Sequence, residues 1–387
     1  MGNLIRHLIA FLLYGDKQAA ALVGYTENRS EWAQYKIVIV PCGHLGKQIV
    51  PPDMGQPRVR QEGDTYVIET DMVYNAFFFT SLAEELLTTE RDQHGRLTAA
   101  HSVLGQHNRL QIPLLDEYGH LLLKLLQLPM PPQQFSAVFL THDIDTVSYY
   151  RSLRGAVGGI MRGQWNRVKT SINNLYNDPA YTFPWLMKQD AKVQSTDFNV
   201  HQLYFAKDTH GDGFDYPQYK LDGVDFPFLA KSINRHGGHI GWHSSYYHFL
   251  PKKDCPLINY SLHRSHYLRC DVNWLEKIAH QGVVHDFSIG FPDQAGFRLQ
   301  TTRPVPWINP YTMELTSLIL HPLTIMDATL SREEYMHLDE DEAYFCCQRL
   351  VDKVRQNNGE LVLLWHNTNI NPDTYHRSLY PKLLALI

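Results

Sequence analysis

The stretch VFLTHDIDT (Val138–Thr146) places two carboxylates, Asp143 and Asp145, directly after a short apolar run. Such a run predicts a buried strand, and acids at the carboxyl end of a buried strand are typical of catalytic bases and metal ligands in α/β enzymes. Because side chains alternate along a strand, residues two apart point to the same side. Two acids at one site bind a cation or acquire different pKa values. The structural alternative, a capped strand end before a polar turn, is equally supported by this stretch alone.

The composition limits the classes of function. The chain has 387 residues, of which 44% are hydrophobic and 19% charged, enough for one large core or two ordinary ones. The net charge of -5 and the lack of a basic block give nucleic-acid binding no electrostatic support. The five cysteines show no CxxC spacing, which indicates reduced thiols and a cytoplasmic protein. No segment approaches the ~20 apolar residues of a membrane span, and the first apolar run predicts an amphipathic helix rather than a signal peptide.

The order of predicted elements indicates two domains, a smaller α/β domain over residues 1–130 and a larger one over 131–387. The linker PMPPQQ (129–134) cannot continue the helix before it. In the first domain we expect helices at 4–13, 71–90 and 114–128 and strands at 36–41 and 65–70. In the second we expect strands at 136–142, 199–206, 237–243, 283–289, 315–327 and 360–366, with helices between them. This alternation predicts parallel strands with crossover helices, which can close into a barrel.

Five predicted strand ends in the second domain carry chemically able side chains. In chain order they are Asp143 with Asp145, His243, Asp293 with Arg298, Asp327, and His366. Active sites of parallel α/β folds gather at this edge of the sheet. One such residue means little, but five together favour a functional site over structural roles.

These motifs resemble the NodB-type polysaccharide deacetylases, carbohydrate esterase family 4, over about 135–387. Asp-x-Asp follows the first strand, then come His-Ser, Phe-Arg and a last strand ending in Trp-His. The stretches DQHGRL, LLDEY, HRSHYLR, SIGFPDQAGFR and LLWHN further resemble bacterial deacetylase-like proteins with an extra N-terminal α/β domain. The resemblance implies a distorted (β/α)7-type barrel preceded by that smaller domain. It also implies a metal-assisted hydrolase that removes an acetyl group from an amino sugar or from a polysaccharide or envelope precursor.

The resemblance also assigns roles. Asp143 would be the general base and Asp145 a metal ligand. Arg298, in Gly-Phe-Arg, would hold the base carboxylate. His366 would be the general acid, and Asp327 is the candidate, by its order in the chain, for the carboxylate that raises its pKa.

The metal motif departs from the family pattern, His-Ser/Thr-x-x-His. The position four residues after His243 holds Tyr247, and His248 is five residues away. On a helix these positions lie ~40° and ~140° from His243, so Tyr247 is well placed, but its hydroxyl keeps its proton near neutral pH. We therefore expect a divalent cation, Zn²⁺ first, on Asp145 and His243. The third ligand stays open between Tyr247, His248, and His266 or another distal group.

Four further residues are candidates for substrate binding. Tyr267 and Arg269 lie in HRSHYLR, whose alternative is the ordinary start of a helix, and Asp293 lies in FPDQAGFR. Trp307 could stack on a sugar ring, although scattered aromatics are more often core. The acidic stretch HGDGFDY (210–216) lacks EF-hand spacing and predicts a plain turn.

Two other functions remain open. The first is a degenerate family member that binds a glycan or precursor without hydrolysis, which the tyrosine at position 247 favours. The second is a different hydrolase chemistry without a tightly bound metal. The sequence does not indicate the sugar, the acyl group or the oligomeric state.

Overall fold

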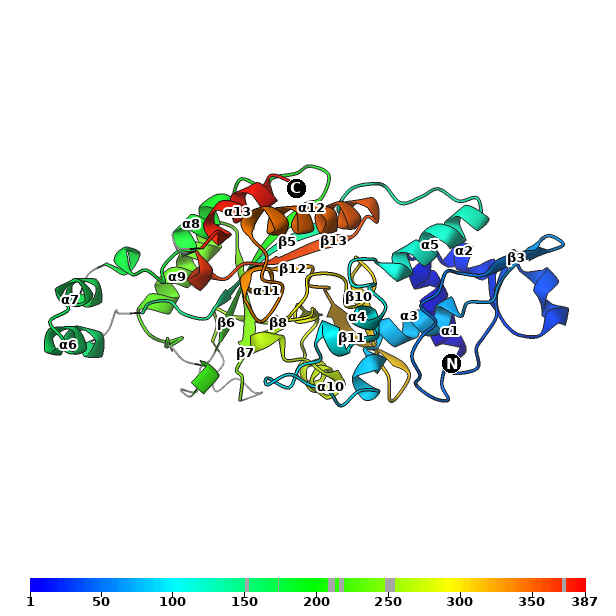
Figure 1. Cartoon of the computed structure of the whole chain (residues 1–387), viewed down its shortest axis with the longest axis horizontal. Helices are drawn as coiled ribbons and strands as arrows, with labels where there is room; N and C mark the ends of the chain where they lie inside the picture. The colour runs from blue at the N-terminus through cyan, green and yellow to red at the C-terminus, as the bar shows by residue number, and fades with distance from the viewer. Residues whose placement is uncertain (150–152, 173, 208–212, 216–218, 248–254, 371–373) are drawn as a thin grey trace. The chain divides into compact units, whose positions relative to one another are not determined.

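The computed structural model describes the chain except for residues 150–152, 173, 208–212, 216–218, 248–254 and 371–373 (Figure 1). The chain forms two compact units. The first unit comprises Met1–Ser136, Leu268–Thr324 and Asp352–Leu361, and the second comprises Ala137–Tyr267, Ile325–Val351 and Val362–Ile387. No helix in the described part of the chain is long and apolar enough to cross a lipid bilayer.

The first unit contains a four-stranded sheet in the order β1-β2-β4-β3. Its strands are β1 (Val23–Tyr25), β2 (Ile37–Ile39), β3 (Val59–Glu62) and β4 (Thr65–Ile68). The pairs β1–β2 and β2–β4 are parallel and β3–β4 is antiparallel. The predicted strands at 36–41 and 65–70 are therefore present.

The helices of the first unit follow the predicted pattern, except that α3 ends earlier than predicted. They are α1 (Gly2–Leu12), α2 (Lys17–Ala21), α3 (Met72–Thr80), α4 (Val103–Gln106), α5 (Leu114–Leu125) and α10 (Val272–His280). As predicted, α3 begins after Asp71, whose carboxylate accepts the N–H of Tyr74 at 2.8 Å. It ends ten residues before the predicted limit of 90, because Leu82 adopts a left-handed backbone with φ 58°.

Residues far apart in the chain build the first unit together. The fully buried carboxylate of Asp116, on α5, accepts hydrogen bonds from the hydroxyls of Thr301 and Thr302 at 2.7 and 2.8 Å. Arg303 Nε donates to the same carboxylate at 2.8 Å. The strands β9 (His285–Asp286), β10 (Val305–Asn309) and β11 (Glu314–Leu320) also lie in this unit. The predicted domain division into residues 1–130 and 131–387 stays a prediction. The two compact units divide the chain differently, because these long-range contacts bring later segments into the first unit.

The second unit is built on parallel strands in the order β8-β7-β6-β5-β13-β12. Their bounds are β5 (Ala137–Ile144), β6 (Asn199–Lys207), β7 (His239–Ser244), β8 (Asn259–Ser265), β12 (Ile325–Met326) and β13 (Glu360–Leu364), the last of which begins in the first unit. The pairs β5–β6, β6–β7, β7–β8 and β12–β13 are parallel. The mixed α/β class is confirmed. The expected barrel is not shown, since the described strands of this unit pair in a linear order.

Helices connect these strands, as the alternation predicted. They are α6 (Leu153–Met161), α7 (Trp165–Ile172), α8 (Phe183–Asp190), α9 (Asp225–Arg235), α11 (Asp327–Ser331), α12 (Glu340–Gln356), which continues into the first unit, and α13 (His376–Leu384). The central strand β5 is buried along its whole length, as expected for a parallel strand covered on both faces. Its one basic residue, His142, is satisfied by the Trp365 carbonyl at 2.7 Å and by Asp190 at 2.9 Å.

Three elements differ from the sequence prediction. The single strand expected at 315–327 is divided into β11 and β12, because Pro322 interrupts the stretch and cannot donate a ladder hydrogen bond. The strand expected at 283–289 is reduced to the two residues of β9. Strand β8 was not predicted, because its buried end consists of the polar residues His263, Arg264 and Ser265 rather than an apolar run.

The Asp116 cluster makes a stability prediction. Replacing Asp116 with alanine leaves the buried Arg303 guanidinium without its carboxylate, so we expect the free energy of unfolding to fall by about 3–5 kcal/mol. Urea denaturation measures this change. The exposed Glu333→Ala variant, as the matched control, should stay within about 0.5 kcal/mol of the parent. An Asp116→Ala variant as stable as this control would contradict the structural role of the cluster.

Candidate active site

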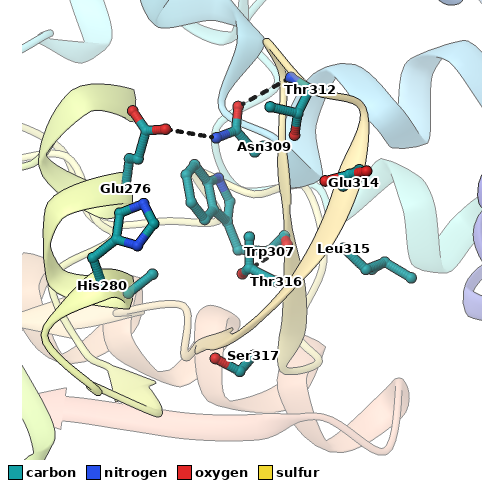
Figure 2. A pocket seen from close by; sticks show the side chains of 10 residues that line it. Glu276, His280, Trp307, Asn309, Thr312, Glu314, Leu315, Thr316 and Ser317 are labelled. Atoms are coloured by element: carbon teal, nitrogen blue, oxygen red, sulfur yellow. Dashed lines mark hydrogen bonds between the residues drawn. The ribbon is translucent and has the colours of Figure 1, made fainter.

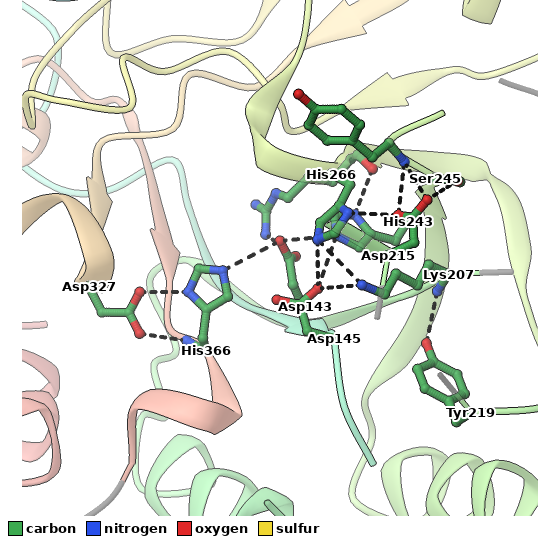
Figure 3. A network of polar contacts seen from close by, with 12 residues as sticks. Asp143, Asp145, Lys207, Asp215, Tyr219, His243, Ser245, His266, Asp327 and His366 are labelled. Atoms are coloured by element: carbon green, nitrogen blue, oxygen red, sulfur yellow. Dashed lines mark hydrogen bonds and ion pairs between the residues drawn. The ribbon is translucent and has the colours of Figure 1, made fainter. Parts of the chain in front are cut away.

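Asp143 lies at the carboxyl end of β5 between a guanidinium and two imidazoles (Figure 3). Arg264 Nη1, from β8, donates to its Oδ1 at 3.0 Å. Its other oxygen, Oδ2, is 3.6 Å from His243 Nε2 and 3.9 Å from His366 Nε2. The four side chains come from β5, β7, β8 and the residues after β13, so the strand ends converge as the topology predicted.

The second acid, Asp145, faces the same histidine. Its Oδ1 is 3.6 Å from His243 Nε2 and 3.3 Å from His266 Nε2. The predicted same-side orientation of the two carboxylates is therefore confirmed. Asp145, His243 and His266 each offer one ligand atom, and these atoms lie within 4.8 Å of one another.

The tautomers of both histidines suit a metal site. His243 Nδ1 is 2.8 Å from the carbonyl oxygen of Arg264, which can only accept, so Nδ1 carries the proton and Nε2 keeps its lone pair. His266 Nδ1 is 3.0 Å from Asp215 Oδ1, and a carboxylate behind a histidine is the usual second partner of a metal ligand. His243 Nε2 and Asp145 Oδ1 are buried atoms that meet no described residue in full hydrogen-bond geometry, although Asp145 Oδ1 lies 3.3 Å from His266 Nε2 and 3.4 Å from Lys207 Nζ. Such atoms are rare, and this donor set fits a divalent cation.

The charges of the site follow from burial and neighbours. Burial would raise the pKa of Asp145, but Lys207, His243 and His266 together hold it well below its ordinary value. Burial lowers the pKa of His243, and the two aspartates offset this only in part. For His266, the contacts with Asp145 and Asp215 outweigh burial and the nearby Lys207, and they raise the pKa.

Lys207 adds a cation to this group. Its Nζ is 3.4 Å from Asp145 Oδ1 and 3.4 Å from His266 Nε2. The lysine is the last residue of β6 and its side chain is buried. The ammonium therefore contacts two of the three candidate ligand atoms.

His366 forms a tight pair with Asp327. Asp327 Oδ1 accepts from His366 Nδ1 at 2.7 Å, and Oδ2 accepts the backbone N–H of His366 at 2.7 Å. Burial would lower the pKa of His366, but Asp327 raises it to about 9. Conversely, burial would raise the pKa of Asp327, and His366 lowers it to about 2. The structure thus brings together the two residues paired from their order in the chain, with His366 Nε2 directed at Asp143.

The place expected for Arg298 beside Asp143 is held by Arg264. Arg298 lies in the first unit, where its Nη2 pairs with Glu85 and its Nη1 donates to the Gly290 carbonyl at 3.2 Å. The arginine motif was assigned by resemblance, whereas Arg264 belongs to the strand that the sequence did not reveal.

The third metal ligand also differs from the expectation. Residues 245–247 after β7 are not helical, so the spacing of four from His243 does not place Tyr247 at the cation site. The Tyr247 side chain is 52% exposed and packs against Tyr246, with 4.8 Å between ring centroids. The alternative ligand His248 lies outside the described residues. His266, left open as a distal candidate, is the residue that joins Asp145 and His243.

Asp215 was missed because its stretch predicted a plain turn. It forms the end of a short 3-10 helix, Gly213–Asp215, and its buried carboxylate accepts from His266, from the Ser245 hydroxyl, and from the Tyr246 N–H at 2.9 Å. Only the folded chain brings this acid behind His266, and no spacing in the sequence indicates it.

Three predicted substrate residues lie in the first unit and have structural contacts there. Arg269 Nε donates to the His94 carbonyl at 2.9 Å, and Asp293 accepts the N–H of Ala99 at 2.9 Å. Trp307 is fully buried and donates from its indole to the Ser81 carbonyl at 3.2 Å. It lines a pocket whose other labelled lining residues in Figure 2 are Glu276, His280, Asn309, Thr312, Glu314, Leu315, Thr316 and Ser317.

Tyr267 is the predicted substrate residue that lies beside the site. Its ring centroid is 4.8 Å from that of His266 and 5.5 Å from those of Phe214 and Tyr246. Its backbone and that of Leu268 are left-handed, with φ 60° and 54°. Consecutive residues of this kind are strained and are concentrated at functional sites.

Comparison with known proteins gives limited matches. Residues 17–131 match a family of unknown function, DUF7033, and no curated protein matches the chain. A putative polysaccharide deacetylase from Mycobacterium smegmatis is similar in structure, with 14% identity, 67% of this chain and 85% of that chain covered, and a TM-score of 0.42. A putative polysaccharide deacetylase involved in O-antigen biosynthesis from Bordetella bronchiseptica has 15% identity, 64% and 79% coverage, and a TM-score of 0.32. At these TM-scores neither structure informs the chemistry of this chain.

Proposed function

We propose that this chain is a metal-assisted hydrolase that removes an acyl group, acetyl first, from an amino sugar or a polysaccharide precursor. The observation that supports this most is the convergence of a base, an acid and a donor set in the second unit. Asp143 Oδ2 lies 3.6 Å from Nε2 of the candidate ligand His243 and 3.9 Å from Nε2 of His366, which is paired with Asp327. The sequence resemblance to polysaccharide deacetylases supports the choice of substrate class.

Asp145, His243 and His266 would hold the divalent cation. Two imidazoles and one carboxylate are a ligand set typical of catalytic zinc sites, which keep a further position open. When bound, such a cation supplies Lewis acidity at the acyl carbonyl. Asp215 and the Arg264 carbonyl orient the two imidazoles through their Nδ1 atoms.

Asp143 would take a proton from the attacking water. Its Oδ1 is held by Arg264 Nη1, which leaves Oδ2 directed into the site. Arg264 is itself fixed, because it is fully buried and its guanidinium packs on the Phe205 ring at 4.6 Å. The base is therefore oriented before substrate arrives, which general-base catalysis requires.

His366 would donate a proton to the departing nitrogen. The Asp327 carboxylate fixes Nδ1 and raises the pKa of the imidazole to about 9, so Nε2 carries a proton at neutral pH. Cleavage of an amide needs a base that takes a proton from water and an acid that gives a proton to the departing amine. Asp143 Oδ2 and His366 Nε2, 3.9 Å apart, would fill these two roles.

An aromatic group beside the site suits a sugar. We use this term for Phe214, Tyr246, Tyr247 and Tyr267, whose rings contact one another next to His266. Phe214 and Tyr247 are 42% and 52% exposed. A pyranose ring presents C–H groups on its faces and hydroxyls at its edge, so it can pack on such rings while its polar groups stay in water.

The alternative function, binding without hydrolysis, is favoured by Lys207. A buried ammonium already lies beside Asp145 and His266, so the same residues could recognise a glycan or precursor with no divalent cation.

The central test is acetate release from chitooligosaccharides after loading with Zn²⁺, Mn²⁺, Co²⁺ or Ni²⁺. Asp143→Asn and His366→Ala should each lower the rate by about 10²–10⁴-fold, the usual contribution of a positioned base or acid. The exposed Asp197→Asn variant should match the parent. Full activity in Asp143→Asn would exclude it as the base. Glycan binding with no acetate release under any loading would establish the alternative function.

The pH dependence should report His366. Because its pKa is raised above 6.5 to about 9, the protonated acid persists through neutral pH, and kcat/KM should fall as pH rises through about 9. Asp327→Asn removes the carboxylate that raises this pKa, while burial still lowers it. The fall of kcat/KM at high pH, the basic limb of the profile, should therefore occur at a lower pH than in the parent. A limb that stays at the same pH in Asp327→Asn would show that this pair does not control the acid.

The aromatic group predicts a split between KM and kcat. Tyr247→Ala removes an exposed ring that contacts no proposed ligand, so KM for an oligosaccharide should rise about 3- to 10-fold, from about 0.5–1.5 kcal/mol per aromatic contact, with kcat unchanged. Tyr247→Phe should retain the parental KM. Tyr176→Ala, at an exposed ring elsewhere in the second unit, is the matched control. An unchanged KM in Tyr247→Ala would exclude this ring from substrate binding.

A further inference from the structure

Lys207 is a charged residue in an unusual position. Its side chain is 1% exposed, and lysine is seldom this deeply buried unless it is paired. In the parallel register Lys207 is the partner of His243, so both side chains leave the sheet on the same face. The backbone N–H of Lys207 donates to the Tyr219 hydroxyl at 2.8 Å, which fixes the end of β6 where the side chain turns inward (Figure 3).

The ammonium contacts the atoms that a divalent cation would use. Nζ is 3.4 Å from Asp145 Oδ1 and 3.4 Å from His266 Nε2. These are two of the three donors of the candidate site. A metal binds such atoms at about 2.0–2.2 Å, so an ion on both of them would lie against the ammonium, and two cations at that separation repel strongly in a buried site.

We infer that Lys207 is a resident cation that competes with the divalent cation for Asp145 and His266. This inference rests on the proposed function, because it concerns the same donors. In the free protein the ammonium balances the Asp145 carboxylate and keeps the donors together. The divalent cation binds only when the ammonium leaves, which the flexible four-carbon stem of lysine permits. Lys207 thereby sets the cation affinity of the site.

The test is cation binding by Lys207→Met, a variant of similar length without charge. The full chain is stripped with a chelator and titrated with Zn²⁺ or Co²⁺ by calorimetry at one fixed pH. Lys207→Met should bind at least about 10-fold more tightly than the parent, equivalent to about 1.4 kcal/mol, while Lys207→Arg should stay close to the parent. The Tm of stripped Lys207→Met should be lower and should recover on adding Zn²⁺. Lys231→Met, at an exposed lysine on α9, should leave both quantities unchanged.

The outcomes separate this inference from the proposed function. If Lys207→Met binds the cation and the parent does not, competition is supported and the ammonium prevails in the parent. If the double variant Lys207→Met/Asp145→Asn then loses this binding, the ion is placed at this site. Equal affinity in the parent and Lys207→Met overturns competition and leaves the metal site intact. If folded parent, Lys207→Met and Lys207→Gln all fail to bind any ion, both the metal site and the competition are overturned. Lys207→Gln serves the same comparison if Lys207→Met does not fold.

Discussion

The ion pair between Asp143 and Arg264 is the interaction on which the candidate site depends. Both groups are buried, and a buried carboxylate without a partner is costly. Arg264 Nη1 supplies that partner at 3.0 Å, and the guanidinium is supported by the Phe205 ring. Because Arg264 lies on β8, three strands away from β5 in the pairing order, the orientation of the base depends on the whole run of parallel strands between them.

The same need for compensation organises the rest of the site. Asp145 is balanced by Lys207 and two histidines, Asp215 by His266, and Asp327 by His366. Each acid lies at or beyond a strand end or in a short turn, where a low-dielectric environment makes its partner matter most. The result is a chain of alternating acids and bases in which the protonation of each member depends on its neighbours. This arrangement distinguishes His366, which holds a proton to about pH 9, from His243, whose lowered pKa keeps it neutral.

The site residues that the sequence could predict differ from the others in one physical respect, the presence of an apolar run before them. The convergence of Asp143, Asp145, His243, Asp327 and His366 could be predicted because each follows a strand with a clear apolar run, and the carboxyl ends of parallel strands meet at one edge. Arg264 was not assigned to the base and His266 stayed one open candidate for the third metal ligand, because β8 carries polar residues at its buried end and lacks that signal. Lys207 and Asp215 contact the site only through the folded chain. The barrel expected from the resemblance is not shown, since alternating strands and helices predict parallel pairing but not closure.

The charge of Lys207 bears on whether this site hydrolyses or only binds. Hydrolysis needs a Lewis acid or an equivalent positive charge at the acyl oxygen, and the proposed ligands can hold a divalent cation only if the ammonium moves. The proposed base and acid are each held by a partner other than Lys207, since Asp143 pairs with Arg264 and His366 with Asp327. A site kept only for binding has no need of an acid with a raised pKa directed at a fixed carboxylate 3.9 Å away. The geometry of that pair is the physical argument that favours the proposed hydrolysis over binding alone, and it makes the cation, rather than the proposed base or acid, the component that decides between them.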